Sequence, residues 1–296
     1  MSPMNRRTLL TAGGAAALGS LAACDEQTMK TVQARLNPTQ ATSGSGAAAP
    51  AANAAAQASA ASAVSESVRM PSEPWTYARF NAAMQTSERP HAIGEAQFNE
   101  IQARKPAAIE RIRTYLDSRF GAHDPKVVQA FESVPRDFYH YAYASDASTA
   151  YQAYEADPKP WAIGHGSVLS DYLGQAYMTQ LAAPKPTDVT LEIGTGSGFQ
   201  SSLLSRIVRD SYTIEIIQPI GEAVGKIFAP LGYDNVHSRV GDGYFGWPEV
   251  TEGFDTIMLT CVAQYAPPEL FRQLKPGGKL IIPIGQPFRR GQVLYV

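Results

Sequence analysis

The apolar positions change their period near the middle of the chain. Before residue 187 they recur at helical spacing, three, four and four positions apart, in Ile109, Ile112, Leu116 and Phe120. Apolar residues over 127–134 predict a second helix, which Pro135 ends. The first part of the fold is therefore predicted to be helical.

From Asp188 onward, short β-branched runs alternate with helical ones. Strands are predicted over 189–193, 212–216, 235–240, 255–260 and 279–284, and helices over 199–208, 220–231 and 267–274. This alternation is typical of a parallel sheet covered on both faces. Right-handed crossovers favour a doubly wound, Rossmann-like sheet. The predicted fold class is α/β, with an N-terminal helical segment.

The N-terminal part differs in composition from the rest. Residues 1–24 combine paired arginines, a short Ala/Gly-rich apolar stretch and Leu-Ala-Ala-Cys ending at Cys24, which is typical of an export signal with a lipobox. This predicts an exported lipoprotein held to the periplasmic side of a membrane through a lipid on Cys24. If the signal is not used, the protein is cytoplasmic.

The composition also divides the chain. Residues 25–70 are rich in Ala, Ser, Gly and Pro and predict a disordered tether. A helical and substrate-side region is predicted over 71–187 and a ligand-binding core over 188–296. A net charge of −2 argues against general nucleic-acid binding. Two cysteines without metal-binding spacing predict neither a disulfide framework nor a metal site.

The turn after the first predicted strand is the candidate ligand site, because ligands of such sheets bind beyond the carboxyl ends of the strands. Residues 191–200 read Leu-Glu-Ile-Gly-Thr-Gly-Ser-Gly-Phe-Gln. Glycines at alternate positions permit a sharp turn and close backbone approach to a ligand. The candidate cofactor-binding residues here are Glu192, Gly194, Thr195, Gly196, Ser197 and Gly198.

Two further acids follow neighbouring strands. Glu215 ends the second strand, where an acid commonly accepts from ribose hydroxyls. Asp242, followed by Gly243, comes after the third strand, where a carboxylate could recognise an exocyclic amine. The Gly-x-Gly-x-Gly spacing favours S-adenosylmethionine over a dinucleotide.

From about Asp117 to Gly285 the chain resembles the protein-L-isoaspartate O-methyltransferases. The resemblance rests on Val-Pro-Arg-Asp-Phe at 134–138, Ile-Gly-His-Gly at 163–166, the glycine loop, Gly-Asp-Gly-Tyr-Phe-Gly-Trp-Pro at 241–248 and Leu-Lys-Pro-Gly-Gly at 274–278. It implies a class I methyltransferase fold, S-adenosylmethionine as the cofactor and a protein or peptide carboxylate as the methyl acceptor. The implied acceptor is an L-isoaspartyl residue, and the implied role is protein repair.

The resemblance also implies an acceptor site at Ile163, Gly164, His165 and Gly166 and in the segment after them. The family's Gln-Thr-Ile-Ser-Gln-Pro is matched by Ser-Val-Leu-Ser-Asp-Tyr at 167–172. Ser170 is therefore the candidate catalytic residue. A carboxylate at Asp171 would repel an acceptor carboxylate and alter the substrate. Alternatively, Asp171 caps the following helix and faces away.

Three functions remain in competition. An acceptor carboxylate is ionised at neutral pH, so methyl transfer needs no general base, and the sequence shows no catalytic triad. Because an exported protein lies outside the compartment that makes S-adenosylmethionine, a non-catalytic binding module is the alternative. A nicotinamide-dependent oxidoreductase comes third. Residues 291–296 fall in a predicted sixth strand, so either the sequence is truncated there or the sheet ends early with an exposed edge.

Overall fold

The computed structural model describes residues 68–89, 93–286 and 292–296. The predicted export signal with Cys24 and the tether up to residue 67 lie outside these ranges. Of residues 68–70, which the composition assigns to the tether, Val68 and Arg69 contact the fold, whereas Met70 is exposed. Val68 is buried, and the guanidinium of Arg69 donates to the carbonyl oxygen of Val208 at 2.7 Å. The described fold therefore begins before Pro71.

The N-terminal half consists of helices and two short hairpins. The helices are α2 (Tyr77–Thr86), α3 (Glu95–Phe120), α4 (Pro125–Ser133), α5 (Arg136–Tyr139) and α6 (Tyr172–Ala182), with the 3₁₀ turn η3 (Ala150–Gln152). The hairpins are β1 (Tyr141–Ala142) with β2 (Ala147–Ser148), and β3 (Trp161–Gly164) with β4 (Ser167–Leu169). Both helices predicted before residue 135 are present. None of the helices in the described ranges has the length and apolar character needed to cross a membrane.

The C-terminal half is a six-stranded sheet in the order β10-β9-β8-β5-β6-β7. Its strands are β5 (Val189–Ile193), β6 (Asp210–Glu215), β7 (Val236–Val240), β8 (Phe254–Leu259), β9 (Leu274–Ile284) and β10 (Val293–Tyr295). Strands β5 to β9 are parallel, and β10 is antiparallel to β9. The predicted doubly wound α/β class is confirmed.

The connecting helices follow the predicted alternation, but β9 begins at Leu274, the last residue of the helix predicted over 267–274. They are α7 (Phe199–Ile207), α8 (Gln218–Gly225) and α9 (Pro268–Arg272), with the 3₁₀ turns η4 (Ala229–Leu231) and η5 (Gly243–Phe245). The single helix predicted over 220–231 is divided into α8 and η4. Pro230 has no backbone N–H, so it cannot continue the hydrogen bonds of an α-helix.

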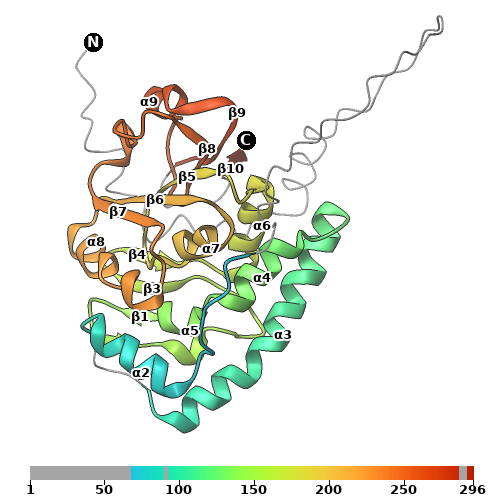
Figure 1. The fold of residues 1–296 in the computed structure, drawn as a ribbon, viewed down its shortest axis with the longest axis vertical. Coiled ribbons are helices and arrows are strands. Elements are labelled where there is room, and N and C mark those ends of the chain that lie inside the picture. The colour runs from blue at the N-terminus through green and yellow to red at the C-terminus, as the bar shows by residue number, and fades with distance from the viewer. Residues whose placement is uncertain (1–67, 90–92, 287–291) are drawn as a thin grey trace, which may run out of the picture.

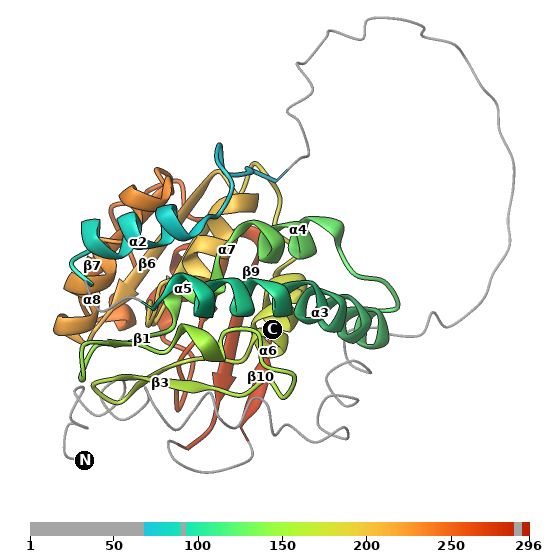
Figure 2. The same ribbon diagram turned by 90° about the horizontal axis from the view of Figure 1, so that it is seen from below.

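Alternate residues of the sheet face opposite layers, as the two-residue period of a strand requires. Met258 and Ile281 pack in one apolar cluster with the side chains of α6. Their neighbours Ile257 and Leu280 pack in another with Leu270 of α9. Figure 1 shows helices α2 to α5, in cyan and green, in the lower part of the view with the short strands β1 and β3, and the six-stranded sheet of β5 to β10 above them. In the turned view, α3 crosses the molecule as its longest helix, close to α4 and α6 (Figure 2).

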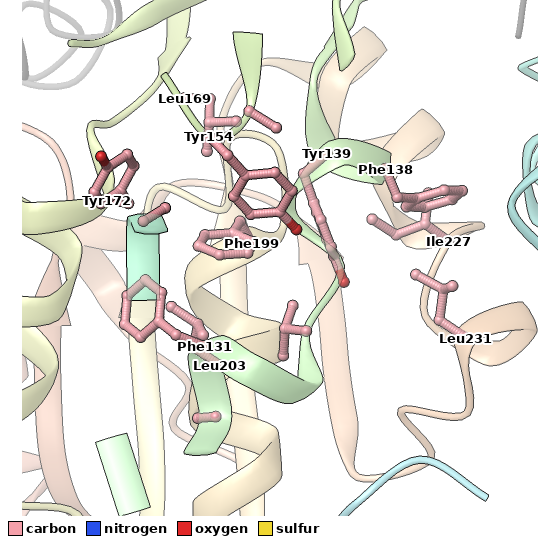
Figure 3. Packing of buried hydrophobic residues seen from close by; sticks show 14 of the residues in the cluster. Phe131, Phe138, Tyr139, Tyr154, Leu169, Tyr172, Phe199, Leu203, Ile227 and Leu231 are labelled. Carbon is pink, nitrogen blue, oxygen red and sulfur yellow. The ribbon is translucent and has the colours of Figure 1, made fainter. Parts of the chain in front are cut away.

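Phe199, the first residue of α7, joins the two halves. Its ring centroid lies 5.8 Å from that of Phe131 on α4 and 5.2 Å from that of Tyr139 on α5. Figure 3 shows the Phe199 ring surrounded by these residues and by Tyr154. The hydroxyl of Tyr139 donates to Ser202 Oγ at 2.7 Å. Edge-to-face aromatic pairs add to the burial of apolar area, so this cluster fixes the helix that follows the glycine loop.

We predict that Gly198→Ala destabilises the protein far more than Gly232→Ala. Both glycines have positive φ, +84° and +71°. A Cβ at Gly198 would lie 2.8 Å from Val224 Cγ1, whereas at Gly232 no heavy atom lies within 4 Å. Both variants carry the roughly 1–2 kcal/mol cost of a left-handed side chain. Overpacking adds about 1–3 kcal/mol at Gly198 alone.

Urea unfolding of the two variants measures this difference directly. Equal losses of unfolding free energy would show that Val224 of α8 leaves room for a side chain at position 198.

Candidate functional site

The loop between β5 and α7 has the geometry that its glycines predict. Gly194, Gly196 and Gly198 have φ values of +101°, +52° and +84°. A Cβ at Gly194 would lie 2.9 Å from Thr260 Oγ1. At Gly196, the nearest heavy atom to such a Cβ is 3.7 Å away, so the loop leaves room beside this residue. The backbone at Gly196 can therefore meet a ligand closely.

A chain of buried polar side chains lies beneath the loop. Thr195 Oγ1 is 2.7 Å from Thr213 Oγ1, and Thr213 donates to Glu192 Oε2 at 3.0 Å. The hydroxyl of Ser201 donates to the same carboxylate oxygen. Glu192 is only 1% exposed, and this burial raises its pKa to about 8. The predicted site residues Glu192 and Thr195 thus support the loop from below.

Glu215 fixes the other side of the loop. Its Oε2 accepts from the backbone N–H of Gly196 at 2.8 Å, and its Oε1 accepts from Ile217 N at 2.9 Å. Burial raises the pKa of this carboxyl group. Each carboxylate oxygen has a second lone pair, so Glu215 can also accept from hydroxyl groups of a ligand.

A cleft separates the glycine loop from the segment that ends at Ser170. Its loop-side wall and its acceptor-side wall together comprise Val168, Leu169, Ser170, Gln175, Glu192, Gly194, Thr195, Gly196, Ser197, Gln200 and Thr260. We call residues 168–170 with Gln175 the acceptor wall. The structure therefore brings Ser170 opposite five of the predicted cofactor residues.

The buried Arg136 holds the acceptor wall from behind. Its Nη2 donates to the carbonyl oxygen of Ser170 at 2.6 Å, and its Nη1 donates to Gln175 Oε1 at 2.7 Å. Its Nε donates to the carbonyl oxygen of Ala153 at 3.2 Å. The guanidinium carbon lies 4.9 Å from the centroid of the Phe199 ring. One side chain thus connects the acceptor wall with the start of α7.

Comparison with known proteins identifies the family. The family profile "Protein-L-isoaspartate(D-aspartate) O-methyltransferase" matches residues 110–296. Protein-L-isoaspartate O-methyltransferase 1 of Nitrosospira multiformis is 47% identical over 171 residues, which is 57% of this chain and 69% of that protein. Protein-L-isoaspartate O-methyltransferase 2 of Syntrophobacter fumaroxidans is 40% identical over 209 residues, 69% of this chain and 81% of that protein.

A solved structure agrees with the sequence relatives. It is named protein-L-isoaspartate O-methyltransferase and superposes with a TM-score of 0.52 at 26% identity, covering 61% of this chain and 55% of its own. This chain belongs to the protein-L-isoaspartate O-methyltransferase family. Membership confirms the predicted enzyme class, a methyltransferase that uses S-adenosylmethionine and acts on isoaspartyl groups of proteins.

Asp171 does not face the cleft, contrary to the altered-substrate hypothesis. It is the N-cap of α6, and its Oδ1 accepts from Gly174 N at 2.8 Å. Burial raises the pKa of this carboxyl group, while the Gly174 N–H and the positive charge of Arg136 act in the opposite direction. The capping alternative is therefore correct, because free N–H groups at a helix start attract an acidic side chain.

The Gly-His-Gly stretch forms the turn between β3 and β4 and does not line the cleft. Ile163 is buried, and its carbonyl oxygen accepts from Tyr143 N at 2.7 Å. A Cβ at Gly164 would lie 2.6 Å from Ala144 N, so only glycine allows the two hairpins to pack. His165 and Gly166 are exposed in the turn. These residues shape the acceptor segment from outside the cleft.

Asp242 and Gly243 follow β7 at the same sheet edge as Glu215. Gly241 N donates to the carbonyl oxygen of Glu215 at 2.9 Å, which brings the two acids to neighbouring loops. Asp242 is exposed and caps η5 through Tyr244 N. A Cβ at Gly243 would lie 2.3 Å from Ile193 Cγ2, so this glycine serves packing against β5.

Sequence reasoning missed Gln175, Gln200, Thr260 and Arg136. Gln200 closes the glycine motif and donates to Thr179 Oγ1 at 2.8 Å. Thr260 directly follows β8 and donates to the carbonyl oxygen of Gly194 at 2.6 Å. The rule that sites lie beyond strand ends could have identified Thr260. Arg136 lies in the Val-Pro-Arg-Asp-Phe stretch that carries the resemblance, which could have identified it, whereas Gln175 acts through a tertiary contact that no local pattern reveals.

We predict that the free energy of unfolding of the wild type falls as the pH rises from 5 to 8, and that Glu192→Gln abolishes this fall. The folded protein keeps a proton on Glu192 up to about pH 8, whereas the unfolded chain releases it near its ordinary value of 4.5. Between these values the native state binds more protons, so its stability falls as pH rises, by at most about 1.4 kcal/mol per unit. Glutamine does not titrate.

Urea unfolding at several pH values tests this prediction. The quantity to compare is the difference in unfolding free energy between the variant and the wild type. The difference should grow toward pH 8. A difference independent of pH would contradict a buried, protonated Glu192.

Proposed function

We propose that this protein transfers the methyl group of S-adenosylmethionine to the free α-carboxylate of an isoaspartyl residue within this cleft. The observation that carries the proposal is the position of the acceptor wall, with Ser170, directly across the cleft from the glycine loop. Family membership supports methyl transfer to an isoaspartyl group, and the arrangement of the two walls supports this cleft as the place where it occurs.

The residues at the strand ends fit the cofactor. Gly194 and Gly196 bring backbone close to it, Glu215 accepts from the ribose hydroxyls, and Asp242 accepts from the adenine amine. Gly198 contributes indirectly, because a side chain there would meet Val224. When bound, S-adenosylmethionine supplies a methyl group on a positively charged sulfur.

Methyl transfer requires the protein mainly to position the acceptor carboxylate and the cofactor. An acceptor oxygen forms a bond to the methyl carbon while the carbon–sulfur bond breaks, and the electron pair stays on sulfur. The products are a methyl ester and S-adenosylhomocysteine. The α-carboxylate is already ionised at neutral pH, so no residue has to remove a proton. Ser170 orients the acceptor, and a cleft that excludes water aids its alignment.

Methyl transfer to matched peptides tests the function. An isoaspartyl peptide should be methylated, and a peptide of the same sequence with a normal aspartyl linkage should not. Absence of transfer at saturating S-adenosylmethionine would favour the binding-module alternative.

We also propose, from residues outside the described ranges, that the protein is exported and anchored through a lipid on Cys24. Paired arginines, a short apolar stretch and Leu-Ala-Ala-Cys support this location.

We predict that Glu215→Gln weakens binding of S-adenosylhomocysteine about tenfold or more. The amide replaces one oxygen by an NH₂ group, which cannot accept from Gly196 N or Ile217 N or from a ribose hydroxyl. Hydrogen bonds to a charged group are worth roughly 1.5–3 kcal/mol.

Isothermal titration measures the affinity. Glu222→Gln is the control, because Glu222 is exposed on α8 and accepts from Gln218. Equal affinities of the Glu215 variant and the control would refute the ribose assignment.

We predict that Cys24→Ser releases the protein from the membrane fraction without changing its melting temperature, because a low-complexity tether is predicted between Cys24 and the globular domain. Cys261→Ser, the control, should stay membrane-bound. Wild-type protein found wholly in the cytosol with Met1 intact would contradict the anchor.

A further inference from the structure

We infer that Gln175 is the residue that recognises the acceptor carboxylate, and that Arg136 sets the orientation of its amide. The inference rests on the proposed function and adds to it the group that selects the substrate. Gln175 lies on α6, three positions beyond the segment 167–172 that contains Ser170 and Asp171.

The orientation of the amide follows from its partner. Gln175 Oε1 accepts from Arg136 Nη1 at 2.7 Å. Because an amide is planar, its Nε2 points away from Arg136, and Gln175 lines the cleft. A guanidinium group only donates hydrogen bonds. If the Gln175 amide were turned so that Nε2 faced Arg136, two donors would meet, so this orientation is excluded.

The Nε2 group is a donor that no acceptor of the described residues binds, although Gln175 is only 7% exposed. The Ser170 hydroxyl on the same wall has no such partner either in the described part of the chain. Two donors on one wall match the two oxygens of a carboxylate.

The surrounding charges support an anionic ligand. The guanidinium of Arg136 lies behind the amide, and burial lowers its pKa only to about 10, so it stays charged at neutral pH. The nearby carboxylate of Asp171 is turned into the start of α6, where Gly174 N binds it. The acceptor wall thus carries no carboxylate group, since Asp171 does not line the cleft.

The other amide of the cleft has a different orientation. Gln200 Nε2 donates to Thr179 Oγ1, which leaves its oxygen for the cleft. An oxygen suits a positively charged group, whereas the NH₂ of Gln175 suits an anion. Gln200 therefore suits the positively charged cofactor, and Gln175 suits the acceptor carboxylate.

Steady-state methylation of an isoaspartyl peptide tests the inference with three variants. Gln175→Leu removes the donor at similar size and should raise the peptide KM about tenfold. Gln175→Glu keeps an acceptor for Arg136 but presents a negative oxygen, and should raise the KM further. Gln180→Leu is the control: Gln180 lies on the same helix, bonds to Ala122 and Asp124, and does not line the cleft.

Binding of S-adenosylhomocysteine separates recognition from general damage to the site. Its Kd should change less than twofold in both Gln175 variants. Peptide KM values within twofold of wild type would overturn the inference while leaving the proposed function intact, as would equal rises in the Gln180 control. A wild-type enzyme that methylates no isoaspartyl peptide would overturn both. If Gln175→Leu does not fold, Gln175→Glu, which retains the contact with Arg136, decides.

Discussion

The contact of the Arg136 guanidinium with the acceptor wall is the interaction on which the site depends. Its three donor groups bind Ser170, Gln175 and Ala153, and its face lies against Phe199. Removing a guanidinium from water is costly unless its donors are satisfied, and here each nitrogen has a partner. The wall that meets the substrate is thereby fixed to the helix that follows the glycine loop.

The two walls of the cleft are positioned by different kinds of interaction. The loop-side wall follows from the topology, because parallel strands deliver Ile193, Glu215 and Thr260 to one edge of the sheet. The acceptor wall comes from the N-terminal half, whose hairpins and α6 are held by aromatic packing and buried hydrogen bonds. Glu192, whose pKa is raised by burial, belongs to the loop-side wall and accepts from Ser201 and Thr213.

Much of the sheet and of the loop-side wall could be predicted from local pattern. The bounds of β5 agree with its apolar run, and the glycines at 194 and 196 have the positive φ that their spacing implies. Asp171 shows where local pattern fails, since a carboxylate beside a substrate motif and a carboxylate capping a helix look alike in sequence. Gln175 was missed because its role depends on Arg136, 39 positions away.

A crystal structure with S-adenosylhomocysteine and an isoaspartyl peptide would test the account most directly. We expect the adenosyl group beside Glu215 and Asp242, and the acceptor α-carboxylate within hydrogen-bonding distance of Ser170 Oγ and Gln175 Nε2. An acceptor carboxylate bound elsewhere, or one that contacts His165 in the β3–β4 turn and not the acceptor wall, would contradict it.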